Sequence, residues 1–227
     1  MQIILNTLNP NLTIFVSILI LYSGPRSHAE DTSIPIERRT KTVQIINKSL
    51  PSVAAIQTFK ESGTKGIYNI QAGSASVIHE AGYLLTNEHV VSEIIQGNAT
   101  LYGDSPKNFE VIATMKSEDL AIIKIDSEKK LPKIPIGRSN DLLLGEPVIT
   151  IGNPGGLNHS ISKGIISGLN RSTSTGAAFL PWMIQTSAAV SGGNSGGPLI
   201  NALGQQIGTI TSKQMGCLLY TSDAADE

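Results

Sequence analysis

Short apolar segments separated by glycine-containing turns dominate this sequence of 227 residues. Apolar and polar side chains alternate within them, which is typical of strands with one buried face. A short helix is expected at 42–50, and 170–178, rich in Ser, Thr and Gly, is expected to be a loop. The expected strands are 52–59, 71–78, 83–86, 99–102, 109–115 and 120–125, then, after a proline-containing linker at 131–135, 148–151, 160–168, 182–186, 199–201 and 206–212. Two groups of short strands predict either two small β-barrels or one β-sandwich.

The composition is that of a folded domain, with 40% hydrophobic and 15% charged residues. The formal net charge of -1 and the sequence pI of 6.4 argue against a nucleic-acid partner, because phosphate binding requires a concentrated basic face. The charge therefore disfavours nucleic-acid binding as the function of this chain.

The first 29 residues have the features of a signal peptide. An apolar run at 12–22 is too short to span a bilayer comfortably, and Ser27-His28-Ala29 has the small-x-small pattern of a cleavage site. Cleavage near Ala29 predicts a secreted or periplasmic protein with a polar leader at 30–50. A retained membrane anchor stays open as the alternative, since no Lys or Arg precedes the apolar run.

The last eleven residues, 217–227, resemble the translation of a DNA sequencing adapter and are predicted to be a non-native tail. This tail contains Cys217, the single cysteine, so the rest of the chain supplies no disulfide framework. The remaining residues divide into a first domain at 51–131 and a second at 136–216.

The segment Gly192–Pro198 places four glycines around Ser195, directly before apolar Leu199 and Ile200. Glycines allow backbone N–H groups to crowd around one point in conformations that other residues disfavour. Two interpretations are open for this bend. It is either a glycine-rich loop with an incidental serine or a nucleophile beside an oxyanion hole.

A nucleophilic serine needs a histidine base and an acid that orients the base. His89 ends a predicted strand, which would hold it rigidly at the rim of a sheet, and Asp119 directly precedes the apolar strand 120–125. Taken alone, His89 could be structural and Asp119 a turn residue. The other candidates are less well placed: His28 in the signal segment, His79 at a hairpin turn, His159 in a polar loop, and Asp104, Asp126 and Asp141.

The order of these residues separates the classes of serine hydrolase. Gly193–Gly197 satisfies G-x-S-x-G, but α/β-hydrolases place their histidine after the serine, and no histidine follows Ser195. The subtilisin order would need an acid before His89, where Asp31 lies in the leader. The order His89, Asp119, Ser195 is that of chymotrypsin.

Three blocks of sequence, 84–91, 118–125 and 185–199, together resemble the signature segments of HtrA/Deg serine proteases. The resemblance implies an all-β fold of two six-stranded antiparallel β-barrels of the chymotrypsin type. Members of the family have a further strand after the position of Ser212, and usually a PDZ domain. The second barrel, 136–216, is therefore expected to be incomplete, and a PDZ domain is expected to be missing from this chain.

The resemblance also implies a role for each site residue, with no metal or cofactor. His89 is the general base, Asp119 orients it, and Ser195 attacks the scissile carbonyl. The oxyanion hole is assigned to the segment Gly193-Asn194, with the backbone N–H groups of Gly193 and Ser195 as donors. Substrate backbone is expected to pair as an added strand with Thr211, Ser212 and Lys213.

The implied function is a secreted endopeptidase that cleaves unfolded polypeptides, with a homotrimer as the implied assembly. A catalytically inactive, chaperone-like binding module on the same barrels is the alternative. Three positions differ from the residues that are usual in the family, namely Ser187, Gly192 and Ala75, and none of them belongs to the triad. Asn194 has no charge for the ion pair that an aspartate at this position makes in digestive enzymes, so activation by a new N-terminus is not expected.

Overall fold

The computed structural model describes residues 35–61, 68–153, 159–175, 178–213 and 219–223. The chain divides into a short unit, Met1–Ile36, and a larger one, Glu37–Glu227, which contains all the described strands. The helical elements are η1 (Ile36–Arg38), α1 (Lys41–Ser49), η2 (Leu50–Ser52) and α2 (Glu88–Val91). The strands are β1 (Val53–Glu61), β2 (Tyr68–His79), β3 (Tyr83–Thr86), β4 (Gln96–Leu101), β5 (Lys107–Met115), β6 (Leu120–Ile125), β7 (Pro147–Gly152), β8 (Ser160–Thr175), β9 (Ala178–Thr186), β10 (Pro198–Ile200), β11 (Gln206–Lys213) and β12 (Leu219–Asp223).

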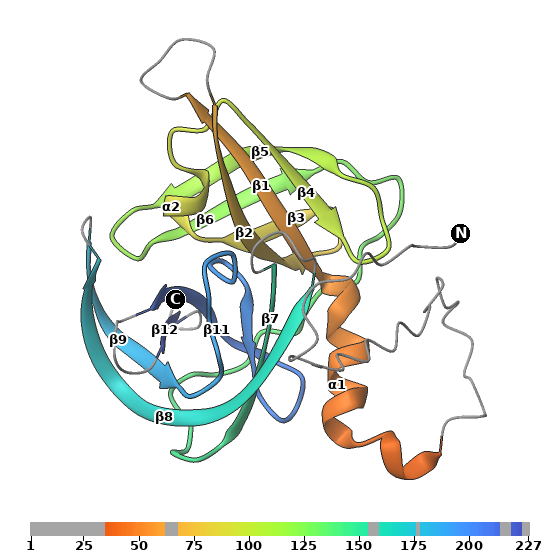
Figure 1. Ribbon diagram of the computed structural model, residues 1–227, viewed down its shortest axis with the longest axis vertical. Coiled ribbons are helices and arrows are strands. Elements are labelled where there is room, and N and C mark those ends of the chain that lie inside the picture. The colour runs from red at the N-terminus through yellow and green to blue at the C-terminus, as the bar shows by residue number, and fades with distance from the viewer. Residues whose placement is uncertain (1–34, 62–67, 154–158, 176–177, 214–218, 224–227) are drawn as a thin grey trace, which may run out of the picture. The chain divides into compact units, whose positions relative to one another are not determined.

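Two closed antiparallel barrels account for these strands, which confirms the predicted all-β architecture (Figure 1). The first has the strand order β1-β2-β3-β6-β5-β4, and the second has β10-β11-β12-β9-β8-β7. Each barrel uses one of the two groups of strands predicted from the sequence. The pairing of β3 with β6, in which Thr86 lies opposite Ala121, brings the end of β3 next to the start of β6.

Alternation along the strands fills each barrel with aliphatic side chains. In β6, Ala121, Ile123 and Ile125 are buried while the residues between them are partly exposed, as expected for a strand with one face in a core. Fully buried Ile56 and Leu84 belong to the same first core. Val148, Ile166, Leu199, Ile207 and Ile210 form the centre of the second.

A third apolar cluster joins the two barrels and the helix α1. Val53 of β1 packs with Ile149 and Ile151 of β7, and Ile45 and Ile46 of α1 lie against this cluster. Thr40 caps the start of the helix, since its hydroxyl accepts a hydrogen bond from the Val43 N–H. The helix ends at Ser49 and is followed by the turn η2, which contains Pro51. The shared cluster fixes the two barrels to each other.

The second barrel differs from the sequence expectation, because it is closed rather than incomplete. Strand β12, from the segment predicted to be a non-native tail, pairs with β11 on one side and β9 on the other. Strands pair through backbone N–H and C=O groups, so segments of many different sequences can pair between two edge strands such as β11 and β9. Whether the tail is native stays a separate prediction.

The predicted loop at 170–178 is also different in the structure. Strand β8 continues to Thr175 and β9 begins at Ala178, so most of this segment is a paired hairpin. Register shifts between Gly168 and Thr173 accommodate its twist. Asn170, Arg171 and Ser172 are exposed, as their polar character predicts, but exposed antiparallel strands are also polar.

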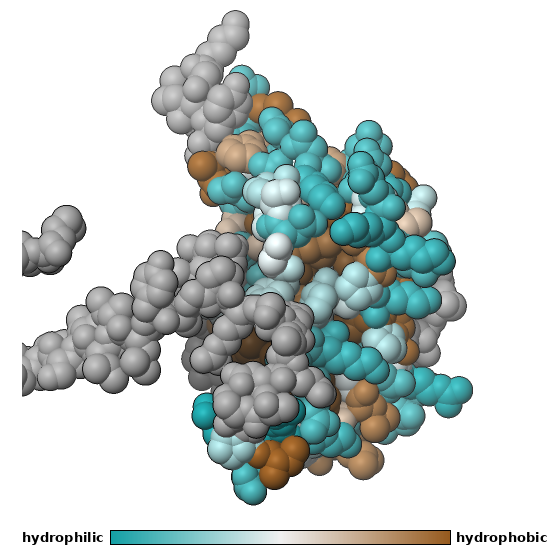
Figure 2. All heavy atoms as spheres, turned by 90° about the vertical axis from the view of Figure 1, so that its right-hand side faces the viewer, coloured by the Kyte–Doolittle hydropathy of each residue, from teal (hydrophilic) through white to brown (hydrophobic). Residues whose placement is uncertain are grey.

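On the face shown in Figure 2, hydrophilic residues cover most of the described surface, and hydrophobic residues lie between them in smaller groups. Among the described residues, no helix is long and apolar enough to cross a membrane. The predicted signal peptide at 1–29 lies outside the described residues.

Candidate active site

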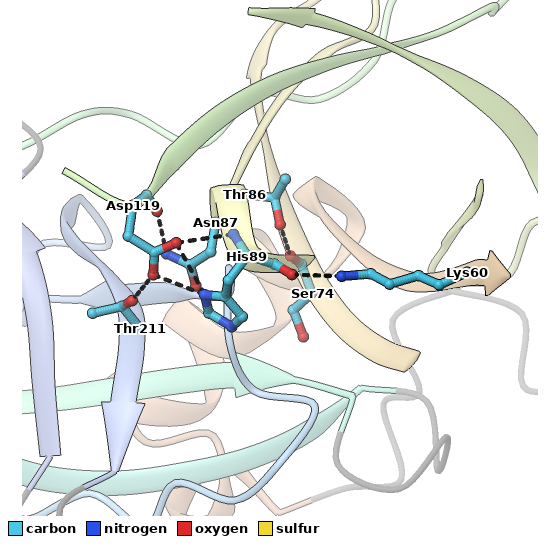
Figure 3. A network of polar contacts seen from close by, with 7 residues as sticks. All are labelled: Lys60, Ser74, Thr86, Asn87, His89, Asp119 and Thr211. Atoms are coloured by element: carbon cyan, nitrogen blue, oxygen red, sulfur yellow. Dashed lines mark hydrogen bonds and ion pairs between the residues drawn. The ribbon is translucent and has the colours of Figure 1, made fainter. Parts of the chain in front are cut away.

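His89 and Asp119 form a hydrogen-bonded pair at the rim of the first barrel (Figure 3). His89 lies on α2, directly after β3, and Asp119 immediately precedes β6. The His89 Nδ1 is 2.8 Å from Asp119 Oδ2 and 3.0 Å from Oδ1, and the His89 backbone N–H donates to Oδ1 over 3.0 Å. The Asp119 side chain is 9% exposed and that of His89 40%. The imidazole is therefore oriented by a buried carboxylate while its own ring remains accessible.

The backbone around Asp119 is shaped to present this carboxylate. Its φ of 53° lies in the left-handed region, which Asp adopts more readily than most residues. The Asp119 carbonyl accepts hydrogen bonds from Asn87 Nδ2 at 2.8 Å and from the Glu88 N–H at 3.2 Å. These contacts tie the two loops that carry His89 and Asp119 to each other.

Thr211 of β11 supplies a third partner for the Asp119 carboxylate, since its hydroxyl donates to Oδ2. The sequence analysis placed Thr211 among the substrate-pairing residues and did not predict this contact between the barrels. Ser212 and Lys213 follow on β11, where they pair with Tyr220 and Leu219 of β12. The other edge of β11 is the one on which added-strand pairing is still predicted.

The Ser195 loop lies against β2 of the first barrel. The Ser195 carbonyl accepts a hydrogen bond from the Ser74 N–H over 2.8 Å. At Gly196, φ is 85°, and a Cβ there would lie 2.1 Å from the Ser74 carbonyl oxygen, so only glycine fits this approach. A Cβ at Gly73 would contact both Val90, the neighbour of His89, and the Ser195 carbonyl. Ser195 of the second barrel and His89 of the first therefore both lie near the same stretch of β2, around Gly73 and Ser74.

Within the described residues, no hydrogen bond joins the Ser195 hydroxyl to the free nitrogen of His89. Hydrogen bonds of catalytic groups are often long in unliganded sites and tighten when substrate binds. The structure thus brings His89 and Asp119 into direct contact and places Ser195 beside them without a direct bond.

The predicted oxyanion segment is only partly supported. The Asn194 N–H donates to the Ser191 carbonyl at 3.0 Å, so within the predicted segment Gly193-Asn194 this N–H is already used. In the described part of the chain, the N–H groups of Gly193 and Ser195 have no acceptor. Gly193 has a φ of 98°, which is accessible to glycine. The donors available to a developing oxyanion are therefore Gly193 and Ser195.

The sequence did not predict Ser74 or Asn87 at this site, and it did not predict that Thr211 contacts Asp119. All three are buried polar residues. Asn87 lies two residues before His89, and Ser74 adjoins the strand residue Gly73, which are weak local signals. Thr211 has none, because its partner Asp119 is 92 residues away in sequence.

The two other histidines that the structure describes, His159 and His79, make hydrogen bonds away from this site. His159 Nε2 lies 2.8 Å from the Val53 carbonyl, and burial lowers the pKa of this imidazole below its usual value. His79 Nδ1 accepts from the Ala81 N–H inside a hairpin turn. Across the described ranges, no three His, Cys, Asp or Glu side chains cluster in a way that could hold a metal ion.

Comparison with known proteins agrees with this arrangement. The model of the trypsin-like peptidase domain matches residues 73–208, which include His89, Asp119 and Ser195. The chain is 37% identical over 179 residues to Protease Do-like 1, chloroplastic, of Arabidopsis thaliana, covering 75% of this chain and 41% of that protein. The chain belongs to the HtrA/Deg family of trypsin-like serine proteases.

Two further comparisons extend the HtrA/Deg assignment. A DegP-like periplasmic serine endoprotease of Halomonas elongata is 40% identical over 136 residues, covering 60% of this chain and 28% of that protein. The solved structure of the HtrA-type protease AlgW with a tripeptide is 32% identical with a TM-score of 0.72, covering 80% of this chain and 59% of that one. This HtrA/Deg chain spans half or less of the length of the curated relatives named here.

Proposed function

We propose that this HtrA/Deg chain is a serine endopeptidase whose triad is His89, Asp119 and Ser195. The observation that carries the proposal is the buried carboxylate of Asp119, 2.8 Å from His89 Nδ1 at the stretch of β2 that also binds the Ser195 carbonyl. A carboxylate on Nδ1 fixes the tautomer in which Nε2 can accept the proton of a serine hydroxyl.

The reaction would proceed by acyl transfer. Ser195 Oγ attacks the scissile carbonyl carbon while His89 Nε2 takes the hydroxyl proton, and Asp119 stabilises the resulting imidazolium. The N–H groups of Gly193 and Ser195 bind the oxyanion of the tetrahedral intermediate. His89 then protonates the leaving amine, and water hydrolyses the acyl-enzyme with His89 again acting as base.

The substrates we propose are unfolded polypeptides, bound as a strand along the Thr211–Lys213 segment. An extended chain can pair with an exposed strand edge through its backbone alone, which suits substrates of varied sequence. The periplasmic location of the DegP-like relative, together with the predicted signal peptide, supports a periplasmic or secreted site of action. A homotrimer and a following PDZ domain stay predictions from the resemblance.

The proposal is tested by incubating the purified chain with a permanently unfolded protein and with the same protein folded. Wild type is expected to cleave the unfolded form preferentially, and Ser195→Ala and His89→Ala are expected to lose cleavage. Ser105→Ala and His79→Ala, which change a serine and a histidine of the first barrel away from the triad, serve as matched controls and are expected to retain it. Peptide binding without cleavage by wild type would favour the inactive binding module instead.

A further inference from the structure

Ser74, at the centre of β2, contacts the Ser195 loop at two points. Its backbone N–H donates to the Ser195 carbonyl over 2.8 Å, and its hydroxyl donates to the Gly193 carbonyl over 2.8 Å. The residue is completely buried, with 0% of its surface exposed. One residue of the first barrel therefore holds carbonyls on both sides of Asn194 in the second.

The direction of the Ser74 hydroxyl is determined by a second contact. The Asn153 N–H donates to Ser74 Oγ over 2.9 Å, and a hydroxyl has only one hydrogen to donate. Because Ser74 Oγ accepts the Asn153 N–H, its own single hydrogen is donated to the Gly193 carbonyl. The Ser74 carbonyl in turn accepts the Thr86 hydroxyl over 2.7 Å, as Figure 3 shows, which fixes the strand that carries Ser74.

These contacts leave little freedom to the peptide planes of the loop. In the plane between Gly193 and Asn194, the carbonyl binds Ser74 Oγ and the N–H binds the Ser191 carbonyl. In the plane that follows Ser195, the carbonyl binds the Ser74 N–H, and the Gly196 N–H binds the Ile210 carbonyl over 2.7 Å. A trans peptide group is planar, so holding both of its ends fixes its orientation.

The plane between Asn194 and Ser195 is oriented by its neighbours. The Asn194 carbonyl accepts from the Gly197 N–H over 2.9 Å, and because C=O and N–H point in opposite directions, the Ser195 N–H points away from Gly197. Gly193, with a φ of 98°, has no side chain to restrict its rotation. Its carbonyl is held by two donors, the Ser74 hydroxyl over 2.8 Å and the Asn153 N–H over 3.3 Å, and the Ser74 bond is the shorter of the two.

We propose that Ser74 is a positioning residue of the peptidase site, whose hydroxyl holds the Gly193 carbonyl so that the Gly193 and Ser195 N–H groups converge on the oxyanion. Asn194 has no charge for an ion pair that could hold the loop in another way. The inference rests on the proposed function, because it assigns Ser74 a role in that same reaction.

The test is a comparison of Ser74→Ala with Ser76→Ala in the full chain. Ser76 is a matched control, since it lies on the same strand, is equally buried, and in the described part of the chain its hydroxyl has no hydrogen-bond partner. Removing an oxyanion donor typically lowers kcat by about 100-fold or more, so disorienting the donors through Ser74→Ala should lower kcat by about 10-fold or more. KM for a short fluorogenic peptide should change less than about twofold, since an oxyanion forms only in the transition state.

The pH profile separates positioning of the oxyanion donors from a general disturbance of the site. Ser74→Ala leaves His89 and Asp119 in place, so the midpoint of the kcat/KM profile should match wild type while its height falls. Ser76→Ala should match wild type in both. Equal kcat values for the two variants, or a shifted midpoint for Ser74→Ala, would overturn the proposal.

Ser74→Cys keeps the inference falsifiable if Ser74→Ala does not fold. The thiol keeps a donor at this position but is a weaker one, so kcat should fall below wild type while the protein remains folded. A Ser74→Cys kcat equal to wild type would overturn the proposal. Absence of any activity in wild type would contradict the proposed function itself, which distinguishes the two failures.

Discussion

Thr211 on β11 donates its hydroxyl to Asp119 Oδ2, so the acid that orients His89 is held from both barrels. The two barrels pack against each other through Val53, Ile149 and Ile151. The Thr211–Asp119 hydrogen bond is a further contact between them, and it lies at the His89–Asp119 pair.

Thr211→Val should reduce kcat/KM by about tenfold, because a hydrogen bond to a charged group contributes about 1.5–3 kcal/mol and the isosteric valine keeps the packing. Thr211→Ser should restore most of the activity. Thr150→Val is the control, since the Thr150 hydroxyl is buried in β7 and has no partner among the described residues. Peptide hydrolysis and thermal unfolding of all three variants would test this, and an equal loss in Thr150→Val would contradict it.

Asp119→Asn should reduce kcat by about 10⁴-fold, as in other serine proteases whose acid is replaced by its amide. The amide can donate to His89 Nδ1, which favours the tautomer with its hydrogen on Nε2 and removes the base. Asp104→Asn is the control, because Asp104 is a surface residue paired with Lys107 at 3.1 Å. Steady-state kinetics would decide, and near-normal turnover by Asp119→Asn would show that this carboxylate is not the triad acid.

Gly196→Ala should abolish activity and lower the free energy of unfolding by several kcal/mol, since its Cβ would lie 2.1 Å from the Ser74 carbonyl oxygen at a φ of 85°. Gly103→Ala separates the two causes, because Gly103 has a φ of 73° with no heavy atom within 4 Å of the added Cβ. It should cost about 1 kcal/mol from backbone strain alone. Similar urea-unfolding curves for the two variants would contradict the close approach of Gly196 to β2.

His159 predicts a loss of stability at mildly acidic pH. Burial lowers its folded pKa below the unfolded value of 6.5, so the unfolded state takes up the proton first as the pH falls. Stability contributed by the neutral imidazole is present above pH 6.5 and is lost as the pH falls from there toward the lowered folded pKa. His159→Gln, which retains a donor for the Val53 carbonyl, should flatten this dependence in urea unfolding between about pH 7.5 and 5.5. An unchanged slope would contradict it.

The sequence predicted the residues whose roles follow from their order and local position. His89 at a strand end, Asp119 before a buried strand and Ser195 in a glycine-rich bend could be found without coordinates, as could the two groups of strands. The role of Ser74 and the contact of Thr211 with Asp119 could not, because the bonded partners lie 119 and 92 residues away and nothing in the local pattern points to them.

Two expectations from the sequence, the loop at 170–178 and the incomplete second barrel, were wrong for the same reason. Residues up to Thr175 and from Ala178 form paired strands, and so does 219–223, although neither segment has the alternation of a core strand. Backbone pairing between neighbouring edges is decided by topology, which side-chain patterns report only indirectly.

The most direct test of the triad is mass-spectrometric mapping of a fluorophosphonate adduct on the purified chain. This reagent phosphonylates only an activated serine, so wild type should carry the adduct on Ser195 alone, and His89→Ala and Ser195→Ala should carry none. His79→Ala should label as wild type does. An adduct on another serine, or no adduct on a folded wild-type chain, would contradict the proposal that Ser195 is the nucleophile of an HtrA/Deg peptidase.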